Sequence, residues 1–220
     1  MDIFKYDIYR GPNIGIFSAV NDNFVFVPNG MTPGKIQTLG KYLNADPVYT
    51  SISNTRLIGI MMVANNNGIL VPKTCLQSEI AHLKKSTGLN VDYLDSKQTA
   101  LGNIICANDK GALVSPIIQK EELQKIKDVL GVEVLQQKIA GYHQTGAMMV
   151  VNLTGGIIHP ETEEDDVKVF EEFFKIKIEP ATINGGIPFV ASGILLNNFS
   201  AVVGTLTNGP EIMMITRAIS

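Results

Sequence analysis

The sequence carries one pattern five times along its whole length, and a long internal repeat constrains the fold more than any other feature. In each copy a small residue, here called the anchor, is followed six positions later by an asparagine. A β-branched residue comes twelve positions after the anchor, and apolar residues come 21 and 24 positions after it. The anchors are Gly15, Gly59, Gly102, Gly146 and Ala191, which lie 44, 43, 44 and 45 residues apart.

Each unit is expected to contain a strand, a two-stranded hairpin and a helix. Apolar residues between the anchor and the asparagine, and again around the β-branched position, are typical of two strands joined at a turn. Asparagine and glycine tolerate the left-handed backbone of hairpin tips, so we expect the tips at the asparagines. The apolar residues at 21 and 24 follow helical spacing. The repeat asparagines are Asn21, Asn65, Asn108, Asn152 and Asn197.

Local signals place the ends of the helices. Thr32 followed by Pro33 is typical of a helix start, and residues 74–77 have the spacing of a capping box. Gly88 and Gly131 stand where a left-handed residue ends a helix. Between each helix and the next anchor there is room for one more strand.

The five units are predicted to close into a ring. An open stack of repeats needs terminal units with a polar outer face, but this chain begins with Ile3 and Phe4 and stays apolar up to Ile219. We therefore expect an α/β fold, a five-bladed propeller in one domain. Strands that converge on an axis would leave little room for a side chain, which explains the small anchors. A closed ring has no free sheet edge, which favours a monomer. The expected units are 1–44, 45–87, 88–131, 132–175 and 176–220.

Composition excludes several classes of protein. The chain has 220 residues, of which 45% are hydrophobic, so it can bury a large core. A net charge of −3 argues against a free DNA or RNA binder. The N-terminus lacks the pattern of a signal peptide, and no apolar run reaches the length of a membrane span. The sequence predicts a cytoplasmic protein.

None of the candidate motifs for phosphate or metal binding predicts such a site. The segment NGMTPGKIQT, residues 29–38, has three residues between its glycines where a P-loop has four. The Asn- and Gly-containing segment 108–111 is read as a hairpin tip, since a phosphate loop would not occur in five copies. His82, His143 and His159 lack metal-ligand spacing, and His159 is expected to be a loop residue. No cofactor or metal site is predicted.

The repeats resemble a known family. TALGNIICANDKGALVSP (residues 99–116) and IGIMMVANNNGILVP (58–72) closely resemble repeats of the translation initiation factor 6 family in its archaeal form. The resemblance implies a five-bladed propeller of the pentein type. It also implies a protein that binds the large ribosomal subunit on its intersubunit face and prevents association with the small subunit, without catalysis. Contacts would run mainly to ribosomal proteins, with the sarcin-ricin loop of the rRNA nearby, in initiation or in subunit maturation.

The resemblance also implies a ribosome-binding surface near the anchors. The matching positions are Asn13, Arg56 and Asn103. Two of them break the repeat: Asn103 takes a strand position that is Ile, Ala or Ser in the other units, and Arg56 replaces Pro, Thr or His. Polar departures at one end of a ring are what a binding face requires. Some relatives have Arg where this chain has Ile60, so that contact is not carried over.

Two alternatives remain open at this stage. The pentein fold also includes guanidino-group hydrolases and transferases, which use a nucleophilic cysteine with histidine and acidic partners. Here Cys75 and Cys106 are expected to be buried or inert, and the last fifth of the chain has no cysteine. The second alternative is a ring-shaped interaction module with another protein target.

Overall fold

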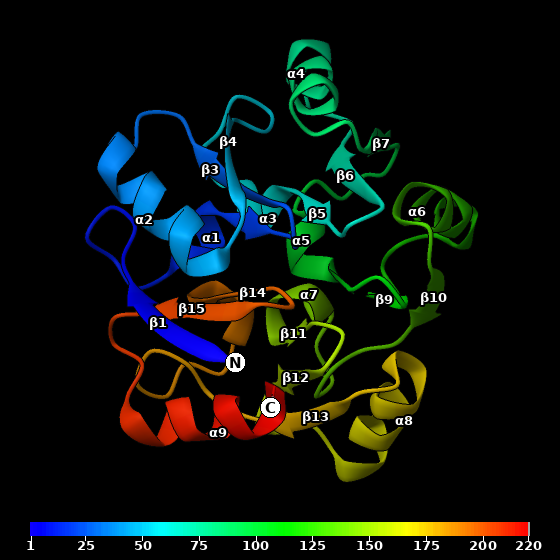
Figure 1. Cartoon of the computed structure of the whole chain (residues 1–220). Coiled ribbons are helices and arrows are strands. Elements are labelled where there is room, and N and C mark those ends of the chain that lie inside the picture. Colours follow the sequence, from blue (N-terminus) through cyan, green and yellow to red (C-terminus); the bar gives the residue numbers. More distant parts are fainter. Residues whose placement is uncertain (220) are drawn as a thin grey trace.

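The chain forms a closed ring of five small sheets around one axis (Figure 1). The computed structural model describes residues 1–219. Each sheet has three strands, of which two form an antiparallel hairpin and the third pairs in parallel with the second hairpin strand. The strands are β2 (Ala19–Val20), β3 (Phe24–Pro28) and β4 (Asp46–Thr50); β5 (Val63–Ala64), β6 (Gly68–Pro72) and β7 (Asn90–Leu94); β8 (Ile105–Ala107), β9 (Gly111–Val114) and β10 (Glu133–Gln136); β11 (Met149–Val151), β12 (Gly155–Ile158) and β13 (Lys177–Pro180); and β14 (Ile194–Leu196), β15 (Ser200–Gly204) and β1 (Asp2–Tyr6).

Pairing between the two ends of the chain closes the ring. Strand β1 lies parallel to β15, in register from Asp2 opposite Ser200 to Tyr6 opposite Gly204. In Figure 1 the blue N-terminal strand accordingly lies beside the orange strands of the last unit. In the other four sheets the third strand follows the outer helix and therefore lies at the start of the next expected unit, as β4 does in 45–87, whereas the last sheet receives its third strand from the N-terminus. The prediction of a closed propeller is confirmed.

The anchors lie in short helices, so the prediction of a strand from anchor to asparagine is wrong in its first half. One helical turn precedes each hairpin, and neighbouring turns contact each other around the axis. A Cβ atom on Gly59 would lie 1.9 Å from the carbonyl oxygen of Gly15, and one on Gly102 would lie 1.9 Å from that of Gly59. The expected axial crowding is therefore confirmed. The inner helices are α1 (Ile14–Phe17), α3 (Ile58–Met61), α5 (Leu101–Ile104), α7 (Thr145–Met148) and η2 (Val190–Gly193).

The hairpin tips lie at the repeat asparagines, as predicted, but for another reason. None of these five residues has a positive φ. Instead each side chain accepts hydrogen bonds from the backbone N–H groups two and three residues further along its own tip, as Asn108 does from Lys110 and Gly111 at 2.8 and 3.0 Å. Each side-chain Nδ2 also donates to the backbone carbonyl of the following asparagine. These links are Asn21 to Asn65 (2.9 Å), Asn65 to Asn108 (3.1 Å), Asn108 to Asn152 (2.9 Å), Asn152 to Asn197 (2.9 Å) and Asn197 to Asn21 (3.2 Å).

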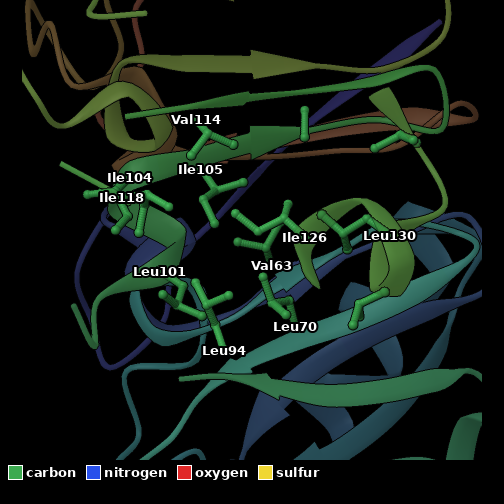
Figure 2. Close-up of a cluster of buried hydrophobic side chains, with 13 residues drawn as sticks. Val63, Leu70, Leu94, Leu101, Ile104, Ile105, Val114, Ile118, Ile126 and Leu130 are labelled. Carbon is green, nitrogen blue, oxygen red and sulfur yellow. The ribbon is translucent and has the colours of Figure 1, made fainter. Parts of the chain in front are cut away.

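Five outer helices surround the ring, and each packs partly against the sheet of the preceding unit. Helix α6 contacts β6 and β7, and α9 contacts β12 and β13. Figure 2 shows the resulting core, in which Val63 and Leu70 of one unit meet Ile126 and Leu130 of the next. The outer helices are α2 (Pro33–Leu43), α4 (Gln77–Thr87), η1 (Lys120–Glu122) continuing into α6 (Leu123–Leu130), α8 (Glu164–Phe174) and α9 (Gly209–Ile219).

The helix signals are mostly confirmed. Thr32 is the N-cap of α2, and Gly88 and Gly131 end α4 and α6 with φ of 70° and 65°. The predicted capping box at residues 74–77 is wrong, because the N-cap of α4 is Leu76, two residues after Thr74, and the Glu79 carboxylate accepts the N–H of Leu76. Within residues 1–219 no helix combines the length and apolar character that crossing a membrane requires.

Substituting an anchor tests the axial packing. We expect Gly102→Ala to lower the free energy of unfolding by about 3 kcal/mol, because its Cβ would meet backbone carbonyls that the whole ring holds in place. Thermal unfolding checks this, since 1 kcal/mol shifts the Tm of such a chain by about 2–4 °C. Gly34→Ala in α2 is the matched control, because a Cβ there meets open space. Equal Tm values for the two variants would contradict axial crowding.

Removing one asparagine tests the link between tips. Asn108→Ala deletes two bonds within the tip and one to the next unit, and it leaves buried backbone groups without partners. We expect a loss of about 2–4 kcal/mol in urea unfolding. Asn23, an exposed neighbour of Asn21 at another tip, provides the control as Asn23→Ala. A loss no greater than that of the control would show that the tips are independent.

Candidate functional site

One end of the ring collects the loops that precede the inner helices. We call this end the anchor face; it consists of residues 7–13, 51–57, 95–100, 138–144 and 182–189 together with α1, α3, α5, α7 and η2. Four of the five loops contain a tight turn closed by a pair of backbone bonds, such as that between Ile8 and Gly11. A fully buried isoleucine begins each of these turns and fixes it to the core. These isoleucines are Ile8, Ile52, Ile139 and Ile183.

The turns hold strained backbone. Tyr9 and Arg10 have φ of 53° and 60°, and Ser53 and Asn54 have φ of 52° and 58°. Tight turns of this shape need positive φ at both central residues, which glycine adopts easily and other residues adopt at a cost of about 1–2 kcal/mol each. Strain of this kind concentrates at functional sites. Six of the eight residues other than glycine with positive φ lie on the anchor face, so backbone strain is concentrated at this end of the ring.

The structure puts the elements that carry Asn13, Arg56 and Asn103 on the anchor face. Asn13 is exposed just before α1, and Arg56 is exposed two residues before α3. Asn103 lies within α5 and is partly exposed, so its predicted strand position is wrong for the same reason as that of the anchors. Helix α1 contacts α3, and α3 contacts α5. The three residues thus come from three consecutive units whose inner helices contact one another.

Arg56 is positioned by an aromatic ring. Its guanidinium carbon lies 5.8 Å from the centroid of the Tyr9 ring, which itself packs edge-on against Phe17 at 5.1 Å. An exposed contact of this kind is worth about 0.5–1 kcal/mol. The cation is therefore held over the boundary between the first and second units while it stays exposed to a partner.

Two buried carboxylates, missed in the sequence, fix loops of this face. Glu79 accepts hydrogen bonds from the Ser51 hydroxyl at 2.6 Å and from the N–H groups of Ser53 and Asn54 at 2.8 and 2.9 Å. Glu211 accepts the Thr182 hydroxyl at 2.8 Å and the N–H groups of Gly185 and Gly186. Both lie 20 positions after an anchor, and four of the five residues there are acidic, so the sequence did contain the signal.

The environment of these carboxylates lowers their pKa values. Burial alone would raise the pKa of Glu79 and of Glu211, but the hydrogen bonds that they accept outweigh it and lower both pKa values below the ordinary 4.5. The side chains are therefore ionised at neutral pH although Glu211 is only 3% exposed. Both carboxylates therefore accept the hydrogen bonds of the loops in their charged form.

The cysteines lack the properties of a nucleophile. Burial raises the pKa of Cys106 to about 12, and burial together with the Glu79 carboxylate raises that of Cys75 to about 12. Both thiols are buried and protonated at neutral pH, whereas covalent catalysis requires a thiolate. Among the described residues, no group of three or more His, Cys, Asp or Glu side chains has the arrangement of a metal site.

The histidines differ in their surroundings. His82 is exposed on α4, with Nε2 2.7 Å from the Tyr49 carbonyl oxygen. His159 lies in the loop after β12, as predicted, but it is only 3% exposed, and its ring centroid lies 5.9 and 6.1 Å from those of Tyr142 and Phe189. The sequence could not show this, since the three residues come from separate segments.

The chain matches the profile of the eIF-6 family over residues 3–218. It is 57% identical to translation initiation factor 6 of Nitrosopumilus maritimus over 218 residues, which cover 99% of both chains. It is 56% identical to the factor of Cenarchaeum symbiosum over the full length of both. Among solved structures, a DDAH mutant from Pseudomonas aeruginosa complexed with citrulline matches 76% of this chain and 68% of its own, with a TM-score of 0.48 and 9% identity.

The buried carboxylates predict a pH effect. We expect Glu211→Gln to lower the free energy of unfolding at neutral pH by about 1–3 kcal/mol, because charged hydrogen bonds become neutral ones. Since the folded-state pKa is lowered, this stability is present above 4.5 and is lost as the pH falls through the folded-state value. The variant should therefore lose less stability than the native chain on acidification.

Urea unfolding at neutral pH and at a series of acidic pH values measures both effects. Glu121→Gln, at an exposed position in η1, is the control for loss of a carboxylate. Identical pH profiles for the native chain and the Glu211→Gln variant would show that the carboxylate does not hold the loop.

Proposed function

This chain belongs to the eIF-6 family, and we propose that it binds the large ribosomal subunit through the anchor face and thereby prevents association with the small subunit. The family consists of translation factors that are not enzymes. The alternative of a guanidino-group hydrolase is accordingly set aside, in agreement with the two buried, protonated thiols.

The observation that carries the proposal is the construction of the anchor face. Three polar residues from consecutive units lie on this face: Asn13 and Arg56 are exposed on loops, and Asn103 is partly exposed in α5. Turns with positive φ hold the loops of Asn13 and Arg56, and the buried Glu79 carboxylate also binds the Arg56 loop. A preformed surface loses little conformational entropy on binding. A factor that acts as an obstacle needs such a stiff surface, because its effect depends on staying in place.

The net charge of the chain favours contacts with ribosomal proteins over contacts with rRNA phosphates. A protein that binds mainly to RNA phosphates depends on Lys and Arg side chains, whereas this chain has a net charge of −3. We propose that ribosomal proteins provide most of the contact and that the sarcin-ricin loop lies nearby, opposite Arg56. A stable interface would bury about 1,200 Å² or more in total. The proposed setting is a monomer in the cytoplasm that acts in initiation or subunit maturation.

Sedimentation with isolated ribosomal subunits tests this function. The native chain is expected to pellet with cognate large subunits, to stay in the supernatant with small subunits, and to stop the two from joining. Arg56→Ala and Asn103→Ser should each weaken binding about fivefold, corresponding to about 1 kcal/mol. Lys85→Ala on α4 and Asn23→Ala at a hairpin tip are matched controls away from the anchor face.

The alternatives give different results. Absence of the native chain from the large-subunit pellet at moderate salt would refute the proposal and favour an interaction module with another protein target. Binding that is normal in the Arg56→Ala and Asn103→Ser variants but weak in the controls would move the docking surface to another part of the ring.

A further inference from the structure

A groove of about 790 Å³ lies at the hairpin-tip end of the ring, opposite the anchor face. We call it the tip groove. Its walls come from the tips before β3 and β15, from the ends of α2 and α4, and from the start of β4. Its volume falls in the range of about 300–1,000 Å³ that is usual for ligand-binding pockets. Its lining includes Asp22, Phe24, Lys41, Asp46, Leu89 and Phe199.

Phe199 departs from the repeat at this end of the ring. Its position, eight residues after the anchor, is polar in the other four units, where it is Asn23, Asn67, Lys110 and Thr154. The backbone N–H of Phe199 donates to Asn197 Oδ1 at 3.0 Å, and the four polar residues make the same bond to their own repeat asparagines. The tip therefore does not need an aromatic ring for its shape, yet Phe199 is 52% exposed. An exposed ring that the fold does not require is typical of a binding site.

Further apolar side chains form another part of the tip groove. Phe24 and Leu89 are half-buried, pack against the core cluster that contains Phe26, and line the groove. The tip that carries Phe24 is fixed, because Asn21 Oδ1 accepts the Phe24 N–H at 2.7 Å. Leu89 follows the end of α4, and its N–H donates to the Thr87 hydroxyl at 3.2 Å. Because hydrogen bonds already set these segments, the chain loses little conformational entropy when the groove is filled.

The tip groove is acidic rather than basic. Asp46 is exposed, and its carboxylate has no ion-pair or hydrogen-bond partner within residues 1–219. Asp22 is held in place by the N–H and the side-chain amide of Asn198, which donate to its carboxylate at 2.9 and 2.7 Å. The C-terminal end of α4, which carries partial negative charge, lies in the same groove at Thr87. Lys41 offsets only part of this charge, so the groove favours a cation and disfavours the phosphates of RNA.

We propose that the tip groove binds a protein segment in which a bulky apolar side chain stands next to a lysine or arginine. The apolar side chain contacts Phe24, Leu89 and Phe199, and the cation pairs with Asp46. Because the tip groove and the anchor face are at opposite ends of the ring, the chain can hold this second protein while the anchor face is on the large ribosomal subunit. Only this simultaneous binding rests on the proposed function.

Titration of the isotope-labelled native chain with short peptides, followed by NMR, tests the inference. The probe is a capped pentapeptide with a phenylalanine between two arginines. In one matched peptide glutamates replace the arginines, and in the other alanine replaces the phenylalanine. We expect the probe to shift the signals of the tip groove with a Kd below about 1 mM, and each matched peptide to bind at least about fivefold more weakly.

Two variants assign the contacts. Phe199→Asn, which restores the residue type of the first and second units, should weaken binding of the probe about 10-fold. Asp46→Asn should reduce the preference for arginine over glutamate about threefold, because it removes an unpaired carboxylate. Tyr93→Ala is the matched control, since Tyr93 is 41% exposed and lies outside the groove. Circular dichroism and Tm verify that the variants are folded.

Several results would overturn the inference. They are the absence of saturable shifts in the tip groove, and equal affinity of the native chain and the folded Phe199→Asn variant for the probe. Shifts of the same signals with protein concentration, in the absence of peptide, would replace the proposed partner by a second copy of this chain. Tighter binding of a short RNA oligonucleotide than of the probe would replace it by RNA.

Sedimentation separates this inference from the proposed function. The Phe199→Asn variant should still pellet with large ribosomal subunits, because the anchor face is unchanged. Loss of pelleting by this variant alone would place the ribosome on the tip groove and overturn the inference. Failure of the native chain to pellet would refute the proposed function and leave the peptide result unaffected.

Discussion

The ring depends on one repeated interaction, the hydrogen bonding of the five repeat asparagines. Each side chain closes its own hairpin tip through Oδ1 and reaches the next tip through Nδ2, so that the same amide sets local and long-range geometry. The bond from Asn197 to Asn21 completes the circuit between the last and first units. Because these groups are buried, leaving any of them unpaired is costly, and each unit therefore depends on both neighbours. The pairing of β1 with β15 joins the last unit to the first in the same way, farther from the axis.

Much of this architecture could be predicted from the sequence, because repeat spacing reports which residues are equivalent. The hairpins, the outer helices, the caps at Thr32 and Gly88, and the closed ring are confirmed. The inner helices were missed because an apolar run as short as Ile14–Phe17 has no distinguishable period. The role of the asparagines was also missed. Their second bond reaches a neighbouring unit, and its geometry exists only once the ring is closed.

Residues of the candidate site could be predicted where they differ from the equivalent residues of the other units. Arg56 and Asn103 stood out because equivalent positions in other units are different, and both are at least partly exposed. Glu79 and Glu211 were missed because their position is acidic in most units and so breaks no pattern. Their function depends on loops 25 to 29 residues distant in the chain, which the sequence alone does not bring into contact.

The two ends of the ring are built by opposite rules. At the hairpin tips all five units use the same residue, and the polar groups of that residue satisfy one another. At the anchor face the units differ, and turns such as Tyr9–Arg10 keep a conformation that isolated chains avoid. The hydrogen bonds shared by the hairpin tips and the packing of the inner helices around the axis together fix the backbone of the ring. Because the ring is fixed, the anchor face can keep its strained turns. The proposed function, occupation of a ribosomal surface, requires neither a moving loop nor a reactive group. It needs a face whose units can diversify while the ring stays rigid, and the division between the two ends provides one.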